Sequence, residues 1–314
     1  MAASAGGDYV LRPTALQLKN VALVILAMAL PVAACRIDAE INPPECGELE
    51  PTGRIYDGDP VTKEKIPWMV AVFSKKGSTK GFSLCGGSII TRNVILTAAH
   101  CVMKKGRYAA KVLVMYHFTL DGKFTGVYAH KIIAHPRFVK RSEVVHDIAL
   151  VKLPVDLEFN RFMKPVCLPT RKMNVAGKGL VVAGWGKTES SNHSKSLRRA
   201  EVIGLTDEQC QYRLRGKNPE TRLPIKPGPG ICAFAIGTGA CKGESGGPLT
   251  LRGDDGRTLQ LGIVSMGRDQ CPTRRPPVYV RVSSHIQWIE KALSNARMWR
   301  KLKLVRKEVS FRMQ

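Results

Sequence analysis

Residues 243–248 read Gly-Glu-Ser-Gly-Gly-Pro and place one serine, Ser245, among glycines. A serine flanked by glycines is by itself usually part of a turn. Two other stretches change that interpretation. Residues 97–101 (Thr-Ala-Ala-His-Cys) end a strand-like run with His100, and residues 147–151 (Asp-Ile-Ala-Leu-Val) open another with Asp147. The order histidine, aspartate, serine, with gaps of 47 and 98 residues, is more specific than any one motif.

Acyl transfer explains why these three residue types belong together. A serine hydroxyl is a weak nucleophile and needs a base within hydrogen-bond reach. Neutral imidazole titrates near neutral pH, so it can accept that proton and return it, and a buried aspartate fixes its tautomer. We therefore predict a catalytic triad of His100, Asp147 and Ser245. The glycines let backbone N–H groups approach a substrate, and we assign the oxyanion hole to Gly243 and Ser245.

The stretch Ile55–Leu293 resembles the chymotrypsin/trypsin-like (S1-type) serine proteases. The motifs TAAHC, DIALVKL, GWG and SGGPL stand in the order of that family. The resemblance implies an all-β fold of two six-stranded antiparallel β-barrels, with the active site between them and a helix at the C-terminus. It also implies a serine endopeptidase that hydrolyses peptide bonds through an acyl-enzyme.

The residue pattern agrees with that fold class. Short runs rich in Val and Ile, broken by Gly, Pro and polar turns, are typical of an all-β barrel or sandwich. After Ser283-Ser284, the residues Ile286, Ile289 and Leu293 repeat at helical spacing. The runs that we expect to be strands are Trp68–Phe73, Gly87–Thr97, Lys111–Phe118, Val127–Ala134, Asp147–Leu153, Gly179–Trp185, Leu259–Ser265 and Val278–Val282.

The N-terminus predicts export. The apolar run Val21–Leu30 follows Arg12 and Lys19 and precedes small residues that end at Cys35. This is the pattern of a signal peptide, so we expect a secreted, extracellular protein. A retained signal anchor and a lipidated Cys35 are the alternatives. We divide the chain into a signal peptide (1–34), a polar propeptide (35–54), a protease domain (55–294) and a basic C-terminal tail (295–314).

Eight cysteines remain when Cys35 is set aside, and an even number in an exported chain predicts disulfides. No two cysteines have CxxC spacing and no acidic cluster follows Cys101, so we expect no metal and no cofactor. The resemblance further implies that Leu180 and Leu251 make an apolar contact where many members have a bridge. The pairs that it implies are Cys46–Cys167, Cys85–Cys101, Cys210–Cys232 and Cys241–Cys271.

Residues 53–58 (Gly-Arg-Ile-Tyr-Asp-Gly) resemble the activation site of the family. Cleavage after Arg54 would free the Ile55 ammonium group, which would pair with the acid before the catalytic serine. That acid is Glu244, where the family usually has aspartate. Because a buried ion pair needs good geometry to offset desolvation, the extra methylene predicts a working but sluggish enzyme.

The resemblance places Gly239 at the floor of the primary specificity pocket. No carboxylate stands there, so we expect a preference for apolar rather than basic side chains before the cleaved bond. Arg268 or Lys242 near the rim leaves a preference for acidic side chains open. A non-tryptic pocket also requires an upstream trypsin-like protease to cut after Arg54. The other pocket residues are Ala240, Gly267 and Pro277, with Met266 replacing a usual tryptophan.

The chain carries a net charge of +24, which favours acidic partners or a basic solvated surface. No nucleic-acid motif accompanies the charge, so nucleic acid is not an expected partner. The basic segment 297–314 is either an amphipathic helix that binds an anionic membrane or glycan, or a frayed extension. Asn192 opens a glycosylation sequon. Further expected partners are protein and peptide substrates and protease inhibitors.

One alternative function stays open. Glu244, Met266 and Pro277 depart from the family pattern, so the chain could be a weakly active or non-catalytic homologue with a binding or regulatory role. An anionic-glycan-binding function rests on charge alone and is compatible with catalysis.

Overall fold

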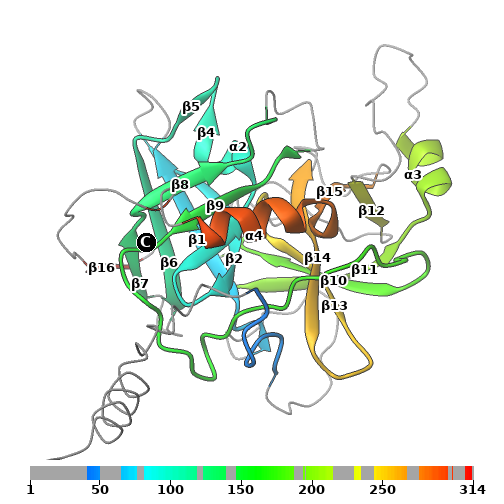
Figure 1. Cartoon of the computed structure of the whole chain (residues 1–314), viewed down its shortest axis with the longest axis horizontal. Helices are drawn as coiled ribbons and strands as arrows, with labels where there is room; N and C mark the ends of the chain where they lie inside the picture. The colour runs from blue at the N-terminus through cyan, green and yellow to red at the C-terminus, as the bar shows by residue number, and fades with distance from the viewer. Residues whose placement is uncertain are drawn as a thin grey trace, which may run out of the picture. The chain divides into compact units, whose positions relative to one another are not determined.

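The computed structural model describes residues 41–49, 65–75, 81–118, 123–138, 146–186, 194, 196–214, 230–234, 244–266, 276–295, 299 and 308–312. Across these residues the chain folds into two large β-structures, a two-stranded hairpin and three short α-helices (Figure 1). Among the helices described, none has the length and apolar character needed to cross a membrane. The predicted signal peptide, residues 1–34, lies outside these ranges.

The first β-structure is a curled sheet of eight strands, and all of its neighbouring strands pair antiparallel. Its strands in spatial order are β16 (Glu308–Arg312), β7 (Lys123–Tyr128), β6 (Lys111–Phe118), β1 (Met69–Lys75), β2 (Ser83–Thr91), β3 (Val94–Thr97), β9 (Ala149–Lys152) and β8 (Lys131–Ala134). The sequence predicted one strand over Gly87–Thr97, which is in fact the β2–β3 hairpin with its turn at Arg92-Asn93.

The strands β7 and β8 explain why this sheet curls. They pair with opposite sides of the sheet, β7 with β6 and β8 with β9, yet only Ala129 and His130 separate them in the chain. The Ala129 N–H donates to Val112 O at 2.8 Å, and the His130 N–H donates to Lys152 O at 2.8 Å. The two strands are therefore halves of one bent strand, which brings the two sides of the sheet together. When β7 and β8 are counted as one strand, this sheet contains the six strands of the predicted first barrel, and β16 is an additional strand.

The second β-structure is a closed six-stranded barrel. A register shift between Leu249 and Thr250 in one strand pair and another between Val264 and Met266 in the next mark irregularities in the barrel wall. Together with the curled sheet, this barrel confirms the predicted chymotrypsin-like fold. Its strands in spatial order are β10 (Gly179–Gly184), β11 (Arg198–Gly204), β12 (Gly230–Phe234), β15 (Val278–Arg281), β14 (Thr258–Met266) and β13 (Pro248–Arg252).

Three helices and a minor hairpin complete the described fold. The predicted C-terminal helix is α4 (Ile286–Ser294), which follows the 3-10 turn η4 (Val282–His285) and buries the predicted apolar positions. The helix α3 (Asp207–Leu214) was not predicted. Its signal is a capping box, because Thr206 and Gln209 each hydrogen-bond the other's backbone N–H through their side chains. The others are α2 (Ala99–Val102), β4 (Met103–Lys104) and β5 (Arg107–Tyr108).

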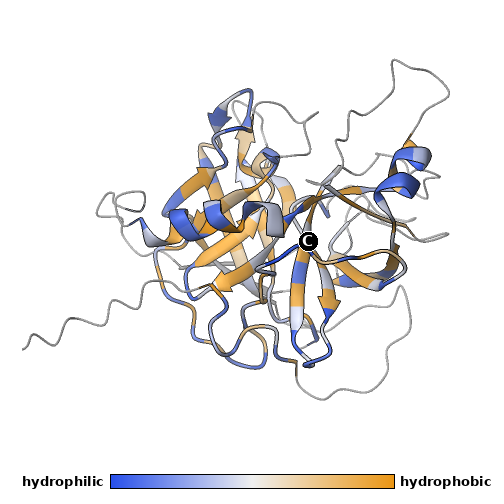
Figure 2. Ribbon diagram, turned by 45° about the vertical axis from the view of Figure 1, so that its right-hand side comes forward, coloured by the Kyte–Doolittle hydropathy of each residue, from blue (hydrophilic) through white to orange (hydrophobic). Residues whose placement is uncertain are grey.

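The apolar side chains divide into two clusters. The larger lies within the first sheet and extends over one face of α4 to side chains of the closed barrel such as Ile263 and Val280, and the smaller lies within the closed barrel. Figure 2 shows the strands largely in the hydrophobic colour and α3 largely in the hydrophilic one. Leu180 is fully buried in the barrel cluster and Leu251 packs against the same cluster, as expected for an apolar contact in place of a bridge.

Three of the implied disulfides are present: Cys46–Cys167, Cys85–Cys101 and Cys210–Cys232. The fourth implied pair, Cys241–Cys271, lies outside the described residues. The first bridge holds residues 41–49 against the protease domain. Hydrogen bonds support it, since the Asn42 side chain donates to Leu168 O at 2.9 Å and accepts from Leu168 N at 2.6 Å.

The C-terminal tail departs from its prediction. Over residues 308–312 it is the strand β16, paired antiparallel with β7 from Glu308 opposite Val127 to Arg312 opposite Lys123. The expectations of a helix or a frayed extension are therefore wrong for these five residues. Glu308-Val309-Ser310-Phe311-Arg312 alternates polar and apolar residues with the period of a strand, and pairing satisfies the backbone groups at the edge of β7.

Candidate active site

The pairing of β3 with β9 brings His100 and Asp147 together. Thr97, the last residue of β3, lies opposite Ala149, the first residue of β9. Because the two strands are antiparallel, the chain after Thr97 and the chain before Ala149 emerge at the same end of the sheet. His100 comes three residues after Thr97, on α2, and Asp147 comes two residues before Ala149.

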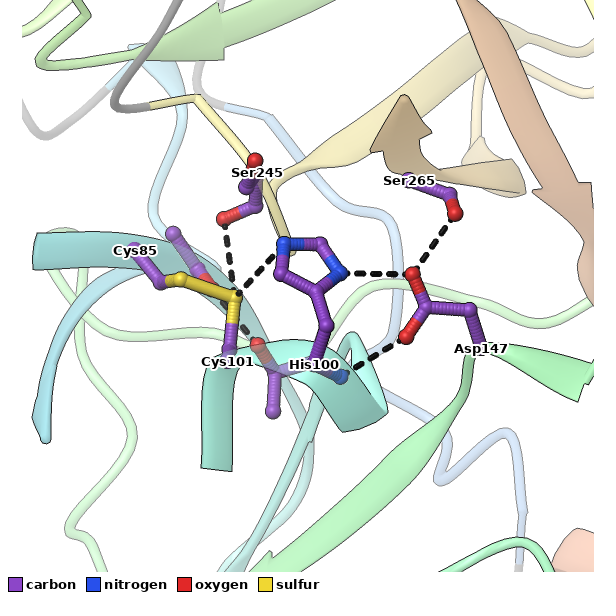
Figure 3. Close-up of polar contacts among 8 residues, drawn as sticks. Cys85, His100, Cys101, Asp147, Ser245 and Ser265 are labelled. Atoms are coloured by element: carbon purple, nitrogen blue, oxygen red, sulfur yellow. Dashed lines mark hydrogen bonds and ion pairs between the residues drawn. A yellow bond between two sulfur atoms is a disulfide. The ribbon is translucent and has the colours of Figure 1, made fainter. Parts of the chain in front are cut away.

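Asp147 is fully buried and its carboxylate accepts three hydrogen bonds. His100 Nδ1 lies 2.6 Å from Asp147 Oδ2, and the His100 backbone N–H donates to Oδ1 at 2.8 Å. The hydroxyl of Ser265 donates to Oδ2 at 2.6 Å. A carboxylate beside Nδ1 favours the tautomer with the proton on that nitrogen, so the lone pair is on Nε2. Figure 3 shows Asp147 on the Nδ1 side of the ring and Ser245 on the Nε2 side.

Ser245 stands on a tight turn that backbone hydrogen bonds hold to both β-structures. The Gly86 N–H of β2 donates to Ser245 O at 2.8 Å, and the Gly246 N–H donates to Val264 O of β14 at 2.7 Å. Gly246 has a φ of +83°, and a Cβ there would lie 2.3 Å from Thr97 Oγ1 and 2.5 Å from Gly86 O. Only glycine fits this conformation and this space.

The disulfide Cys85–Cys101 lies against both residues. Cys101 Sγ is 3.8 Å from His100 Nε2 and 3.5 Å from Ser245 O. A sulfur in a disulfide carries no proton, so these are packing contacts rather than hydrogen bonds. For the same reason Cys85 and Cys101, although they lie close to His100, offer no thiolate ligand to a metal.

Sequence reasoning missed Ser265. It lies on β14, is fully buried and reaches Asp147 from the closed barrel. The available signal was that Ser265 immediately precedes Met266, which stands where the family usually has tryptophan. Ser265 links the two β-structures through the carboxylate that holds His100.

Glu244 precedes Ser245 and packs against the GWG motif. A Cβ at Gly186 would lie 2.7 Å from Glu244 Cγ, and one at Gly184 would lie 2.9 Å from the same atom. The two glycines therefore leave the space that the longer side chain occupies. Burial, with a smaller contribution from the charge of Glu244, raises the pKa of Tyr279 well above its usual range.

The other predicted site residues lie mostly outside the described ranges. Of the specificity pocket, Pro277 is described and is buried. Residues outside the ranges are Gly239, Ala240 and Gly267 of the pocket, Gly243 of the oxyanion hole, Arg54 and Ile55 of the activation site, and Asn192 of the sequon.

Comparison with known proteins agrees with the fold. Residues 55–289 match the family model Trypsin. The clotting factor G beta subunit of Tachypleus tridentatus is 33% identical over 272 residues, or 82% of this chain and 85% of that protein. Melanization protease 1 of Drosophila melanogaster is 31% identical over 277 residues, or 79% and 67%. Phenoloxidase-activating factor 1 of Holotrichia diomphalia is 30% identical over 271 residues, or 80% and 73%.

The fold and the buried carboxylate–histidine pair define a chymotrypsin-like protease scaffold. With the family model covering most of its length, the chain belongs to the trypsin family of serine proteases.

Proposed function

We propose that this protein is a secreted serine endopeptidase that uses His100, Asp147 and Ser245 as its catalytic triad. The observation that carries the proposal is the buried Asp147 carboxylate, which accepts hydrogen bonds from both the ring and the backbone N–H of His100. Such a pair supplies an oriented general base, which a serine nucleophile requires.

In the proposed reaction, Ser245 Oγ attacks the carbonyl carbon of the peptide bond while its proton passes to His100 Nε2. Asp147 stabilises the imidazolium that forms. The C–N bond then breaks as His100 returns the proton to the leaving amine, and water hydrolyses the resulting ester by the same route in reverse. The backbone N–H groups of Gly243 and Ser245 would stabilise the oxyanion of each tetrahedral intermediate.

We further propose that the chain is a zymogen that an upstream trypsin-like protease activates by cutting after Arg54. The new Ile55 ammonium group would pair with Glu244. After the cut, residues 41–49 would stay attached, because Cys46 and Asn42 lie before Arg54 and are joined to Cys167 and Leu168 after it by a disulfide and by hydrogen bonds. The names of the relatives point to clotting and phenoloxidase activation, which supports protein substrates within a protease cascade.

The specificity that we propose is for apolar side chains before the cleaved bond. Pro277 supports it, because it is buried and carries no carboxylate that could pair with a basic substrate side chain. Secretion, glycosylation at Asn192, protease inhibitors as partners and an anionic glycan or membrane as a ligand of the tail stay proposals on sequence grounds.

The test is to cut the purified chain after Arg54 with immobilised trypsin, remove the trypsin, and offer an organophosphate serine probe and a mixed peptide library. We expect labelling of Ser245 and cleavage after apolar residues. A Ser245→Ala protein treated in the same way is the matched control and should show neither.

The same experiment decides the alternative of a non-catalytic homologue. The specific feature behind that alternative is Glu244, whose extra methylene separates it from the usual aspartate. Cut protein that neither labels nor cleaves beyond the Ser245→Ala control would favour a binding or regulatory role. Cleavage only after Lys or Arg would overturn the proposed specificity and leave the endopeptidase in place.

A further inference from the structure

Three histidines meet outside the proposed catalytic site. His135 follows β8, His146 immediately precedes Asp147, and His285 ends the 3-10 turn before α4. One ring nitrogen of each lies within 4.8 Å of those of the other two. His285 is buried, whereas His135 and His146 are half-buried. We call these three residues the histidine cluster.

The first pair of the histidine cluster already has the spacing of two zinc ligands. His146 Nδ1 lies 3.2 Å from His285 Nε2. Two nitrogens bound at about 2.0–2.1 Å from a tetrahedral zinc ion stand about 3.3 Å apart. A metal ion could therefore replace the hydrogen bond between these rings with little movement of either.

The second coordination shell of His285 is also in place. Its other ring nitrogen, Nδ1, lies 2.9 Å from the backbone oxygen of Arg281. A carbonyl accepts only, so Nδ1 carries the proton and Nε2 offers its lone pair to the cluster. Histidines that bind metals commonly donate their second nitrogen in this way, which fixes the tautomer and the ring orientation.

His135 supplies the third nitrogen after a rotation of its ring. It stacks on His146 with centroids 4.5 Å apart and 9° between the planes, and it meets Trp288 edge-on at 5.1 Å. Lone pairs of parallel rings do not converge, so the His135 ring must turn toward the other two. Its half-exposed position allows the turn, and the Arg137 N–H contact to Nδ1 is a long 3.3 Å.

We propose that His135, His146 and His285 bind one divalent transition-metal ion of the zinc class, with water in the fourth position. Three neutral imidazoles suit Zn²⁺, Cu²⁺, Ni²⁺ or Co²⁺, whereas Ca²⁺ and Mg²⁺ require oxygen ligands, and no carboxylate belongs to this cluster. The partial exposure of two of the rings gives the ion an entry path.

Bound metal would tie together three segments around Asp147. The His135 N–H donates to Ile148 O at 2.9 Å, and the Ile148 N–H donates to His146 O at 2.8 Å. Both backbone hydrogen bonds lie next to Asp147, whose carboxylate holds His100.

A ligand that binds only the native state raises its stability, so metal at a hundredfold excess over its Kd should raise Tm by about 5–10 °C.

The test uses the full-length chain without a histidine tag and with Ser245→Ala, so that proteolysis does not interfere. Calorimetric titration with Zn²⁺ should show one site per chain, and Co²⁺ should give the visible absorption of a four-coordinate ion. In His285→Gln the Zn²⁺ affinity should fall at least about a hundredfold. The matched control is His130→Gln, which removes a histidine of the same sheet region and should retain wild-type affinity.

His146→Gln serves as a second ligand variant in case His285→Gln disturbs folding, and metal-free Tm values identify any such disturbance. Loss of Zn²⁺ binding in a ligand variant with a native-like metal-free Tm supports the proposal. Three outcomes would overturn it: no saturable Zn²⁺ binding by the parent protein, wild-type affinity in both ligand variants, or an equal loss in His130→Gln.

Discussion

His100 and Ser245 reach the same site from two different β-structures, and the two structures hold them in different ways. His100 is held by a side chain, because the fully buried Asp147 carboxylate accepts hydrogen bonds from its ring and from its backbone N–H. Ser245 is fixed by backbone hydrogen bonds to Gly86 and by the turn that Gly246 permits. The histidine side is thus complete before any cut after Arg54, whereas the proposed function of the serine side depends on that cut.

This contrast indicates that activity should be regulated on the serine side. A charge-assisted hydrogen bond in a buried site is strong and needs no external partner. Glu244, next to Ser245, packs over Gly184 and Gly186, and in our proposal it pairs with the Ile55 ammonium group after the cut. Mutations on the histidine side should therefore reduce the activity of the cut enzyme directly, and mutations at Glu244 should act through activation.

The largest effect is expected for Asp147→Asn. The amide would favour the wrong tautomer of His100 and would not stabilise the imidazolium, so kcat of the cut enzyme should fall about 10⁴-fold. Steady-state hydrolysis of a peptide substrate measures it. Asp156→Asn, at an exposed carboxylate beside β9, is the matched control and should stay near wild type. A loss below about tenfold would contradict the assigned role of Asp147.

The serine side is tested by Glu244→Gln. Removing one partner of a buried ion pair costs about 3–5 kcal/mol, so the active population after the cut should fall about 10²–10⁴-fold. Probe labelling of Ser245 measures that population. The downfield proton resonance of the His100–Asp147 hydrogen bond should persist, since Glu244 does not contribute to it. If the variant labels as fast as the wild type, Glu244 does not control activation.

Ser265→Ala breaks the link between the two sides. A hydrogen bond to a charged group contributes about 1.5–3 kcal/mol, part of which should appear in the transition state. We expect about a tenfold fall in kcat/KM and a change in the pH profile of kcat, because Ser265 positions Asp147 and does not touch substrate. Ser294→Ala, at an exposed serine of α4, is the control. An unchanged pH profile would assign Ser265 a purely structural role.

Much of this fold is readable from the sequence because it rests on local patterns. The runs rich in Val and Ile and the motifs around His100, Asp147 and Ser245 are visible in the sequence, whereas the register of β3 against β9, which brings His100 to Asp147, comes from the fold. Strand ends were less predictable. Val127–Ala134 was expected as one strand, and the bend at Ala129-His130 depends on which neighbour each half pairs with, which is a long-range property.

The unpredicted parts of the site share that cause. Ser265 reaches Asp147 across 118 residues, and His146 reaches His285 across 139, so no window of sequence contains either contact. The expectation of no metal considered only cysteine spacing and acidic clusters. Histidines that far apart become ligands only when the fold brings them together.

The smallest effect is expected at β16, which pairs with β7 at one edge of the first sheet. Deleting residues 306–314 would expose the edge of β7 and remove five paired residues, so Tm should fall by about 2–4 °C, the equivalent of about 1 kcal/mol. Hydrolysis of a small peptide substrate should not change, because neither β-structure loses a residue of the site. Deleting only Met313-Gln314 leaves β16 whole and should leave Tm unchanged. Equal Tm values for all three chains would mean that β16 contributes nothing to stability, and a loss of activity with an unchanged Tm would place the tail at the site itself.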